Sequence, residues 1–230
     1  MDKGKAELDF SIVLGSAIHD MKNSISMLLD GLEGISENCS GECQANTSVD
    51  KLRYEGKRLN NGLVQVLTLY RINNASYTLN LAENDVEEVL EECKMDNEDL
   101  LALKGIEIEL DYDEDLMCFF DRELISGVIN SVLNNAYKYT KDKIRITAFE
   151  KDGYLAIAIE DNGPGYPDFM LQGATDRQRE ISFKRDSTGL GIFFAHTIVN
   201  MHANRDKHGF VTIANDGIDG GGRFVINLPV

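Results

Sequence analysis

The chain has 230 residues, of which 43% are hydrophobic, so it is long enough for one or two domains with a buried core in each. Asp and Glu number 39 against 23 Lys and Arg, and the resulting net charge of −16 argues against binding to nucleic acid or anionic membranes. Every apolar run is far shorter than the roughly 20 residues that cross a bilayer, and the N-terminus lacks an apolar signal core. Four scattered cysteines do not form a disulfide framework, so we expect a soluble, cytoplasmic protein with no membrane span.

Apolar residues recur every three or four positions over about residues 6–38 and again over 52–70, which predicts two long amphipathic helices. The segment between them, 39–48, is rich in Gly, Ser, Asn and Cys and is expected to be the connecting loop. These elements predict an antiparallel helical hairpin over residues 1–78. Two such helices cannot cover their own apolar stripes, so we expect a homodimer in which two hairpins form a four-helix bundle.

Residues 79–230 mix helical and strand patterns, which predicts a second domain of the α+β class. Asn84 followed by Glu87 resembles a capping box that opens a helix, and further helices are predicted over about 121–139 and 190–202. Alternating apolar and polar residues predict five strands with one buried face each, at 106–110, 144–148, 155–159, 211–213 and 224–228. We expect a sheet whose buried face is covered by helices, an α/β sandwich.

A carboxylate follows directly on the predicted strand 155–159. Asp161 opens the sequence Asp-Asn-Gly-Pro-Gly, in which Gly163 and Gly165 permit a tight chain reversal. A carboxylate held at such a strand end can accept a hydrogen bond from the amino group of adenine. An ordinary Asp-Gly turn after a strand explains these residues equally well when they are taken alone.

Glycines also precede the predicted helix 190–202. Gly189, Leu190 and Gly191 lead into the apolar pattern, where unpaired N–H groups of a helix N-terminus could face phosphate oxygens. The alternative is a plain glycine-containing loop. The chain matches neither GxxxxGK[ST] nor GxGxxG at this place, which excludes the P-loop and Rossmann nucleotide folds.

The predicted helix 121–139 ends in polar residues that share one face. Asn135 and Lys138 are three positions apart, so an amide oxygen could bind Mg²⁺ while an ammonium group contacts phosphate. A solvated helix face is the alternative explanation.

In chain order, five segments together resemble the catalytic half of bacterial two-component sensor histidine kinases. These segments are HDMKN (19–23), DRELISGVINSVLNNAYKYT (121–140), EDNGPG (160–165), STGLGI (187–192) and GGGRFVINLP (220–229). The resemblance implies a dimerisation and histidine phosphotransfer hairpin over 1–78. It also implies an ATP-binding catalytic domain of the gyrase/Hsp90/histidine kinase type over 79–230.

The resemblance also assigns roles in binding ATP and Mg²⁺. It makes Asn135 the magnesium ligand and Lys138 a phosphate contact, whereas Asp161 reads adenine. The remaining cofactor-binding residues that it implies are glycines of the adenine pocket and the short segment beside the triphosphate: Gly163, Gly165, Gly189, Leu190 and Gly191. A lid over ATP is implied for residues 166–187, from which Lys184 or Arg185 reaches the phosphates. One departure is Ser131, which stands where the family usually has a further asparagine.

The phosphorylated residue implied by the resemblance is His19. A neutral imidazole can attack the γ-phosphoryl group of ATP and form phosphohistidine, although a lone histidine on a helix usually has no such role. The resemblance makes Asp20 the acid that accepts or holds the imidazole proton. It makes Asn23, one turn after His19, the residue that orients water for dephosphorylation of a partner.

We therefore expect an enzyme, a soluble histidine protein kinase, that passes the phosphoryl group from His19 to an aspartate of a response regulator receiver domain. Only 18 residues precede His19, so the input is expected to come from a separate sensory protein, unless the sequence is a piece of a longer one. Two alternatives remain: a serine kinase of the anti-sigma type with a related ATP-binding fold, and a non-catalytic phosphotransfer scaffold. Cys39 and Cys43 are either ordinary loop cysteines or a redox or metal switch.

Overall fold

The computed structural model describes residues 20–21, 23–24, 27–28, 42–74, 77–171 and 189–230. Internal contacts divide the chain into two compact units, Met1–Tyr77 with Asp176–Leu190 and Thr78–Thr175 with Gly191–Val230. His19, Cys39 and most of the expected lid, including Lys184 and Arg185, lie outside the described residues. No helix in the described part of the chain is both long enough and apolar enough to cross a membrane.

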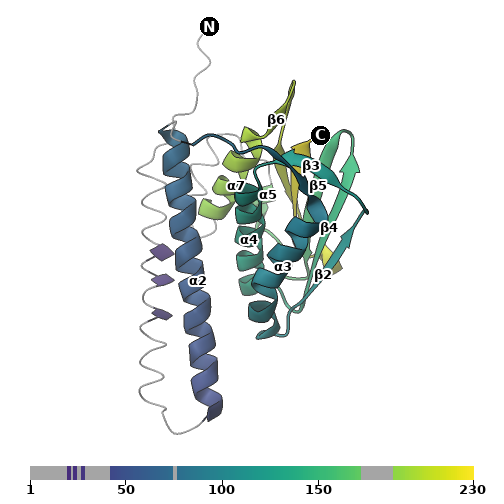
Figure 1. The fold of residues 1–230 in the computed structure, drawn as a ribbon. Coiled ribbons are helices and arrows are strands. Elements are labelled where there is room, and N and C mark those ends of the chain that lie inside the picture. Colours follow the sequence, from purple (N-terminus) through teal and green to yellow (C-terminus); the bar gives the residue numbers. More distant parts are fainter. Residues whose placement is uncertain (1–19, 22, 25–26, 29–41, 75–76, 172–188) are drawn as a thin grey trace. The chain divides into compact units, whose positions relative to one another are not determined.

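Helix α2, Glu42–Asn73, is the main described element of the first unit (Figure 1). Six residues of the preceding segment are also helical, at 20–21, 23–24 and 27–28, as predicted for helix 6–38. The prediction of a loop up to residue 48 is wrong, because α2 already begins at Glu42. Residues 42–48 contain neither Gly nor Pro, so nothing in the backbone prevents the helix from extending through this polar segment.

A mixed five-stranded sheet forms the core of the second unit, and all five predicted strands are confirmed as its members. Its strands, in spatial order, are β2 (Glu107–Tyr112), β4 (Lys143–Lys151), β5 (Tyr154–Asp161), β9 (Arg223–Pro229) and β8 (Phe210–Ala214). The β2–β4 pair is parallel and the other neighbours are antiparallel. Two pairs of short antiparallel strands were not predicted: β1 (Ala82–Asp85) with β3 (Met117–Phe120), and β6 (Ala203–Asn204) with β7 (Lys207–His208). Strands of two to four residues are too short to show a period-two pattern.

Helices cover one side of this sheet (Figure 1): α3 (Val86–Ala102), α4 (Arg122–Tyr139) and α7 (Gly189–Met201), with the short α5 (Asp168–Leu171) nearby in the chain. The strands bury Ile146, Ile157 and Ile226, which are all 0% exposed. Ile125 and Ile129 of α4 are likewise 0% exposed. Burial of this apolar surface is the main force that holds helices and sheet together. The predicted α+β class is therefore confirmed.

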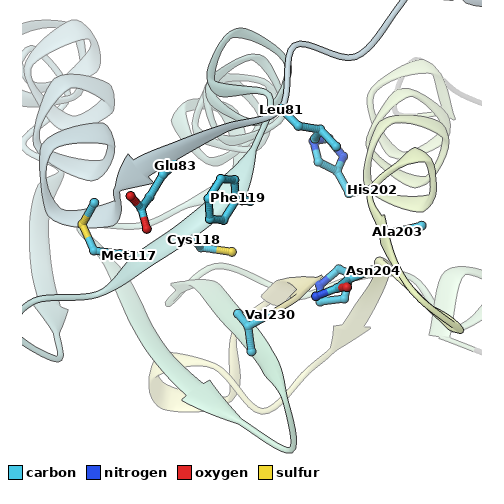
Figure 2. A pocket seen from close by; sticks show the side chains of 10 residues that line it. Leu81, Glu83, Met117, Cys118, Phe119, His202, Ala203, Asn204 and Val230 are labelled. Atoms are coloured by element: carbon cyan, nitrogen blue, oxygen red, sulfur yellow. The ribbon is translucent and has the colours of Figure 1, made fainter.

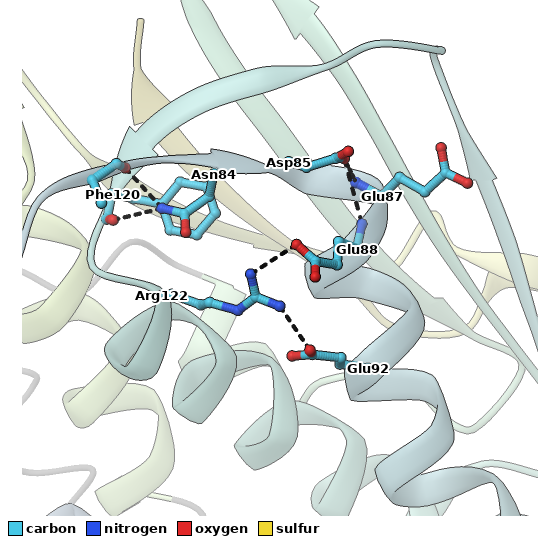
Figure 3. A network of polar contacts seen from close by, with 8 residues as sticks. Asn84, Asp85, Glu87, Glu88, Glu92, Phe120 and Arg122 are labelled. Carbon is cyan, nitrogen blue, oxygen red and sulfur yellow. Dashed lines mark hydrogen bonds and ion pairs between the residues drawn. The ribbon is translucent and has the colours of Figure 1, made fainter.

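The first helix of this unit is capped by a different residue from the one predicted (Figure 3). Asp85 is the N-cap of α3, and its Oδ1 accepts hydrogen bonds from the N–H groups of Glu87 at 3.0 Å and Glu88 at 3.4 Å. Asn84 lies in β1 instead, and its Nδ2 donates to the carbonyl of Phe120 at 2.8 Å. The prediction of a capping box at Asn84 was wrong because the side chain of Asn84 holds strands β1 and β3 together and is not available to the helix.

Candidate nucleotide-binding site

Asp161 is the last residue of β5, and two hydrogen bonds fix it there. Its backbone N–H donates to the carbonyl of Gly222 at 2.9 Å, and its Oδ1 accepts from the N–H of Gly163 at 2.6 Å. A Cβ on Gly222 would lie 2.8 Å from Oδ2 of Asp161, so only glycine leaves that oxygen uncovered. Burial, followed by the negative charge of Asp161, raises the pKa of Tyr166, which keeps this phenol neutral.

The two glycines after Asp161 are required by close contacts. A Cβ on Gly163 would lie 2.6 Å from the carbonyl oxygen of Tyr139, at the C-terminal end of α4. Gly165 has a φ of +76°, and a Cβ there would lie 2.6 Å from Cγ of Asn215. The chain reversal predicted from the sequence is thus a loop held between the end of α4 and the segment after β8.

Two asparagines that the sequence analysis did not single out fix this loop. Asn162 is 6% exposed, accepts from the N–H groups of Asp142 at 3.2 Å and Lys143 at 3.1 Å, and donates to Oδ1 of Asp142 at 2.7 Å. Asn215 accepts from the N–H of Tyr166 at 2.6 Å and donates to its carbonyl at 2.8 Å. The place of Asn162 within Asp-Asn-Gly-Pro-Gly was a usable signal, because Asn side chains often bind turn backbone. Asn215 gave no such signal, because it is 49 residues from Tyr166.

The first turn of α7 lies against the middle of α4. A Cβ on Gly191 would lie 2.9 Å from Oγ of Ser131 and 3.5 Å from Nδ2 of Asn135, so the lack of a side chain permits this approach. Asn130, which is one position from Ser131, accepts a hydrogen bond from Asn97 of α3 at 2.6 Å. Ser131 and Asn135, one helical turn apart, are therefore the α4 side chains beside Gly191.

Lys138 and the first residues of α7 complete the set of predicted nucleotide-binding residues. Lys138 is exposed, and its Nζ lies 5.0 Å from the ring centroid of Tyr139. Gly189 is the first residue of α7, where backbone N–H groups lack helical partners. Leu190 is 4% exposed, so its apolar side chain is buried and only its backbone can offer a hydrogen bond to a phosphate.

In the first unit, Asp20 and Asn23 are both helical; Asp20 is partly buried and Asn23 is exposed. His19 precedes Asp20 and lies outside the described residues.

The side chains of Ser131 and Asn135, whose Oγ and Nδ2 are the atoms nearest to Gly191, fit a magnesium ion that also binds phosphate. The described residues contain no group of three or more His, Cys, Asp or Glu side chains that could hold a metal. Mg²⁺ prefers oxygen ligands and often takes only one or two from the protein, with the rest from phosphate and water. The amide of Asn135 and the hydroxyl of Ser131, which both approach Gly191, fit such a sparse protein contribution.

A separate cavity of about 490 Å³ lies on the second unit and contains none of the predicted site residues (Figure 2). Its walls come from the β1–β3 strand pair, the residues that follow α7 and the end of the chain, and include Leu81, Phe119, His202 and Val230. The cavity therefore does not belong to the candidate nucleotide site.

Comparison with known proteins identifies the class of this fold. Residues 120–230 match the family of histidine kinase-, DNA gyrase B-, and HSP90-like ATPases. The match covers α4, Asp161 and its glycine loop, and α7, so it contains the groups described above. The second unit thus carries an ATPase domain of this family.

This chain is also similar in sequence to longer curated proteins. The sensor protein SrrB of Staphylococcus aureus is 24% identical over 223 residues, which are 94% of this chain and 37% of SrrB. This chain thus spans little more than a third of the length of the curated relatives that it matches. The resemblance to sensor histidine kinases is confirmed by this homology together with the ATPase domain.

Solved structures agree on the fold. The histidine kinase AdeS of Acinetobacter baumannii superposes with a TM-score of 0.62 at 23% identity, over 92% of this chain and 97% of AdeS. The histidine kinase ThkA, solved in complex with the response regulator TrrA, gives a TM-score of 0.53 at 17% identity, over 92% of this chain and 59% of that one. The fold of this chain is therefore that of histidine kinase catalytic regions.

Proposed function

We propose that this chain is a histidine protein kinase that phosphorylates itself on His19 from Mg²⁺–ATP and passes the phosphoryl group to an aspartate of a response regulator receiver domain. Residues 1–78 are then the dimerisation and phosphotransfer hairpin, and residues 79–230 the ATP-binding domain. The observation that carries the proposal is the assembly of Asp161, Gly163, Asn135 and Gly191 around the end of β5 and the α4–α7 pair, within a domain of this ATPase family.

Adenine binding is proposed for the end of β5. Oδ1 of Asp161 already accepts from Gly163, so Oδ2, beside Gly222, is the oxygen that accepts from the adenine amino group. Such a contact distinguishes adenine from guanine, which has a carbonyl oxygen in place of that amino group. The triphosphate then lies toward the N-terminus of α7, where unpaired N–H groups favour an anion. Lys138, exposed near the end of α4, supplies a positive charge to it.

Magnesium binding is proposed for Asn135, supported by Ser131. The ion, when bound, would offset negative charge on the phosphates of ATP and so aid departure of ADP. This chain would contribute the hydroxyl oxygen of Ser131 and the amide group of Asn135, and Gly191, which lacks a side chain, would leave space beside them for the triphosphate.

Phosphoryl transfer is proposed to occur at the imidazole of His19. A neutral ring nitrogen attacks the γ-phosphorus, a nitrogen–phosphorus bond forms as the bond to the β–γ bridging oxygen breaks, and ADP leaves. Asp20 accepts the ring proton that the attack releases. The phosphoryl group then passes from nitrogen to a carboxylate oxygen of the receiver domain, and histidine is regenerated.

Phosphatase activity toward the partner is proposed for Asn23. It lies four residues after His19 and is exposed, so its amide can orient a water molecule against an aspartyl phosphate. The structure of ThkA with TrrA supports a response regulator as the partner, because it shows that a kinase of this fold forms such a complex.

A homodimer is supported by an exposed apolar stripe on α2. Leu63, Leu67 and Tyr70 are 44%, 55% and 49% exposed and follow one another at helical spacing. Such a stripe on a long helix is suited to burial against the same stripe of a second copy in a four-helix bundle.

The proposal is tested by incubation with γ-labelled ATP and Mg²⁺, followed by treatment of the labelled protein with acid and alkali. The wild type should acquire an acid-labile, alkali-stable label that is absent from His19→Gln. His208→Gln, which changes an exposed histidine in the same way, should be labelled like the wild type. An acid-stable label would favour the serine kinase, and a failure to bind ATP would favour a non-catalytic scaffold.

A further inference from the structure

Two contacts between α4 and α7 show in which direction the two helices run relative to each other. Gly191, at the start of α7, approaches Ser131. In the middle, a Cβ on Gly127 of α4 would lie 3.8 Å from the ring of Phe194. The contacts run in opposite directions along the two sequences, so the helices are antiparallel. The far end of the pair, where α7 ends and α4 begins, is therefore about four helical turns from Asn135.

A buried histidine joins the helices at that far end. His202 follows directly on α7, is 2% exposed, and accepts on Nε2 a hydrogen bond from the backbone N–H of Asp121 at 3.1 Å. Its Nδ1 lies 2.9 Å from the carbonyl oxygen of Ile198. The Asp121 N–H can only donate, so Nε2 must be the acceptor, and the ring proton sits on Nδ1 and is donated to Ile198.

The residue that receives this contact is the one that starts α4. Asp121 is the N-cap, and its Oδ1 accepts from the N–H of Leu124 at 3.1 Å. Its Oδ2 accepts from the N–H of Asn80 at 2.9 Å, at the beginning of the second unit. His202 thus connects the end of α7 to a backbone position that is itself fixed by further hydrogen bonds.

The face that α7 buries is otherwise apolar near this contact: Phe194, Ala195, Ile198 and Val199 are all at most 2% exposed. Apolar burial is non-directional and by itself permits packed helices to shift along their axes. A buried polar contact between two helices, in contrast, selects one register, because a shift leaves its donor and acceptor without partners.

We propose that His202 is a positioning residue for nucleotide binding: it fixes the register of α7 against α4 and thereby holds Gly191 beside Ser131 and Asn135. The inference rests on the proposed function, because it concerns the phosphate and metal end of that site. His202 itself lies at the other end of α7, beside the separate cavity (Figure 2), and does not contact the nucleotide. The adenine end depends on β5 and β9, so we expect His202 to affect it little.

Two substitutions at position 202 separate register from general stability. His202→Gln places an amide oxygen near the position of Nε2 and can still accept from Asp121. His202→Asn is shorter, can keep the contact with Ile198, and loses the one with Asp121. Both replacement side chains are neutral and smaller than that of histidine. His208→Gln, at an exposed position of the same unit, is the matched control.

The dissociation constant of ATP is measured for each protein with Mg²⁺ and with a chelator, and the ratio of the two values gives the gain from magnesium. We expect this gain to fall about tenfold in His202→Asn, to remain near the wild-type value in His202→Gln, and to be unchanged in His208→Gln. The affinity without Mg²⁺, which reports mainly the adenine contact, should change less than about twofold in all three.

The outcomes distinguish a failure of the proposed function from a failure of the inference about His202. A wild type that binds no ATP overturns the proposed function and the inference with it. A wild type with a magnesium gain that His202→Asn retains, even with a lower melting temperature, leaves the proposed function standing and overturns the inference. If His202→Asn does not fold, the ring nitrogen resonances of the wild type decide the question. Addition of Mg²⁺ to the ATP-bound protein should shift the His202 resonances and not those of His208, and unshifted His202 resonances overturn the inference.

Discussion

Asn162→Ala should destabilise the loop that presents Asp161. The substitution removes three hydrogen bonds of a side chain that is 6% exposed: two from the backbone N–H groups of Asp142 and Lys143, and one to the carboxylate of Asp142. At about 1 kcal/mol for each net hydrogen bond, the free energy of unfolding should fall by about 3 kcal/mol. Alanine cannot replace any of the three, and the N–H groups lose their acceptor.

The measurement is hydrogen exchange of the β4 and β5 amides in increasing urea, which follows the unfolding of this unit separately from that of α2. Asn227→Ala is the matched control, because it removes one exposed hydrogen bond, 3.2 Å long, from Nδ2 to Phe210. The control should change the free energy of unfolding by about 0.5 kcal/mol or less. A loss in Asn162→Ala no larger than that of the control would refute the reasoning that these hydrogen bonds hold the loop.

Three further predictions concern ATP binding, pH and assembly. Gly163→Ala should weaken ATP binding at least about tenfold by calorimetry, because its Cβ would meet backbone of α4, whereas Gly62→Ala, with open space around it, should not. Burial lowers the pKa of His202 in the folded protein below its usual value of about 6.5. As the pH falls, the imidazole is therefore protonated first in the unfolded chain, and the free energy of unfolding decreases below about pH 6.5. The stability of His202→Gln should therefore fall less between about pH 7 and about pH 5 in urea titrations, and an equal loss in both proteins would contradict the assignment. Leu67→Glu should shift sedimentation toward a monomer, whereas Met95→Glu, at an exposed position of α3, should leave the sedimentation unchanged.

Much of the fold of the second unit could be predicted because its patterns are long. The strands around Ile146 and Ile226 alternate between buried and more exposed residues over five or more positions. The prediction of one buried face is wrong for β5, around Ile157, because its residues 155–159 are buried on both faces. The N-cap of α3 was missed by one residue because Asn84 and Asp85 are both good caps, and only the pairing of β1 with β3 decides between them. The β1–β3 and β6–β7 pairs were missed because strands of two to four residues are too short to show a period-two pattern.

The residues of the candidate site are likewise of two kinds: some are indicated by sequence motifs, and others are brought together only by the fold. Asp161, its glycines and Asn135 were found because motifs fix residue types at fixed spacing along the chain. Asn215 was not, because its partner Tyr166 is brought to it only by the neighbouring paths of the chain in the folded unit. Ser131 was noted as standing where the family usually has asparagine, and the rotation of α4 places Ser131 beside Gly191 and the neighbouring Asn130 beside α3.

The sequence by itself determined the order of the main helices and strands, the class of the second unit and the residue types at its candidate nucleotide site, since local spacing and chemical type are properties of the chain. Tertiary structure alone decided which oxygen of Asp161 stays uncovered, how closely Gly191 approaches α4, and that His202 meets the cap of a helix 81 residues earlier. These relations join segments that are far apart in the chain. They exist only once burial of the apolar faces has brought those segments together.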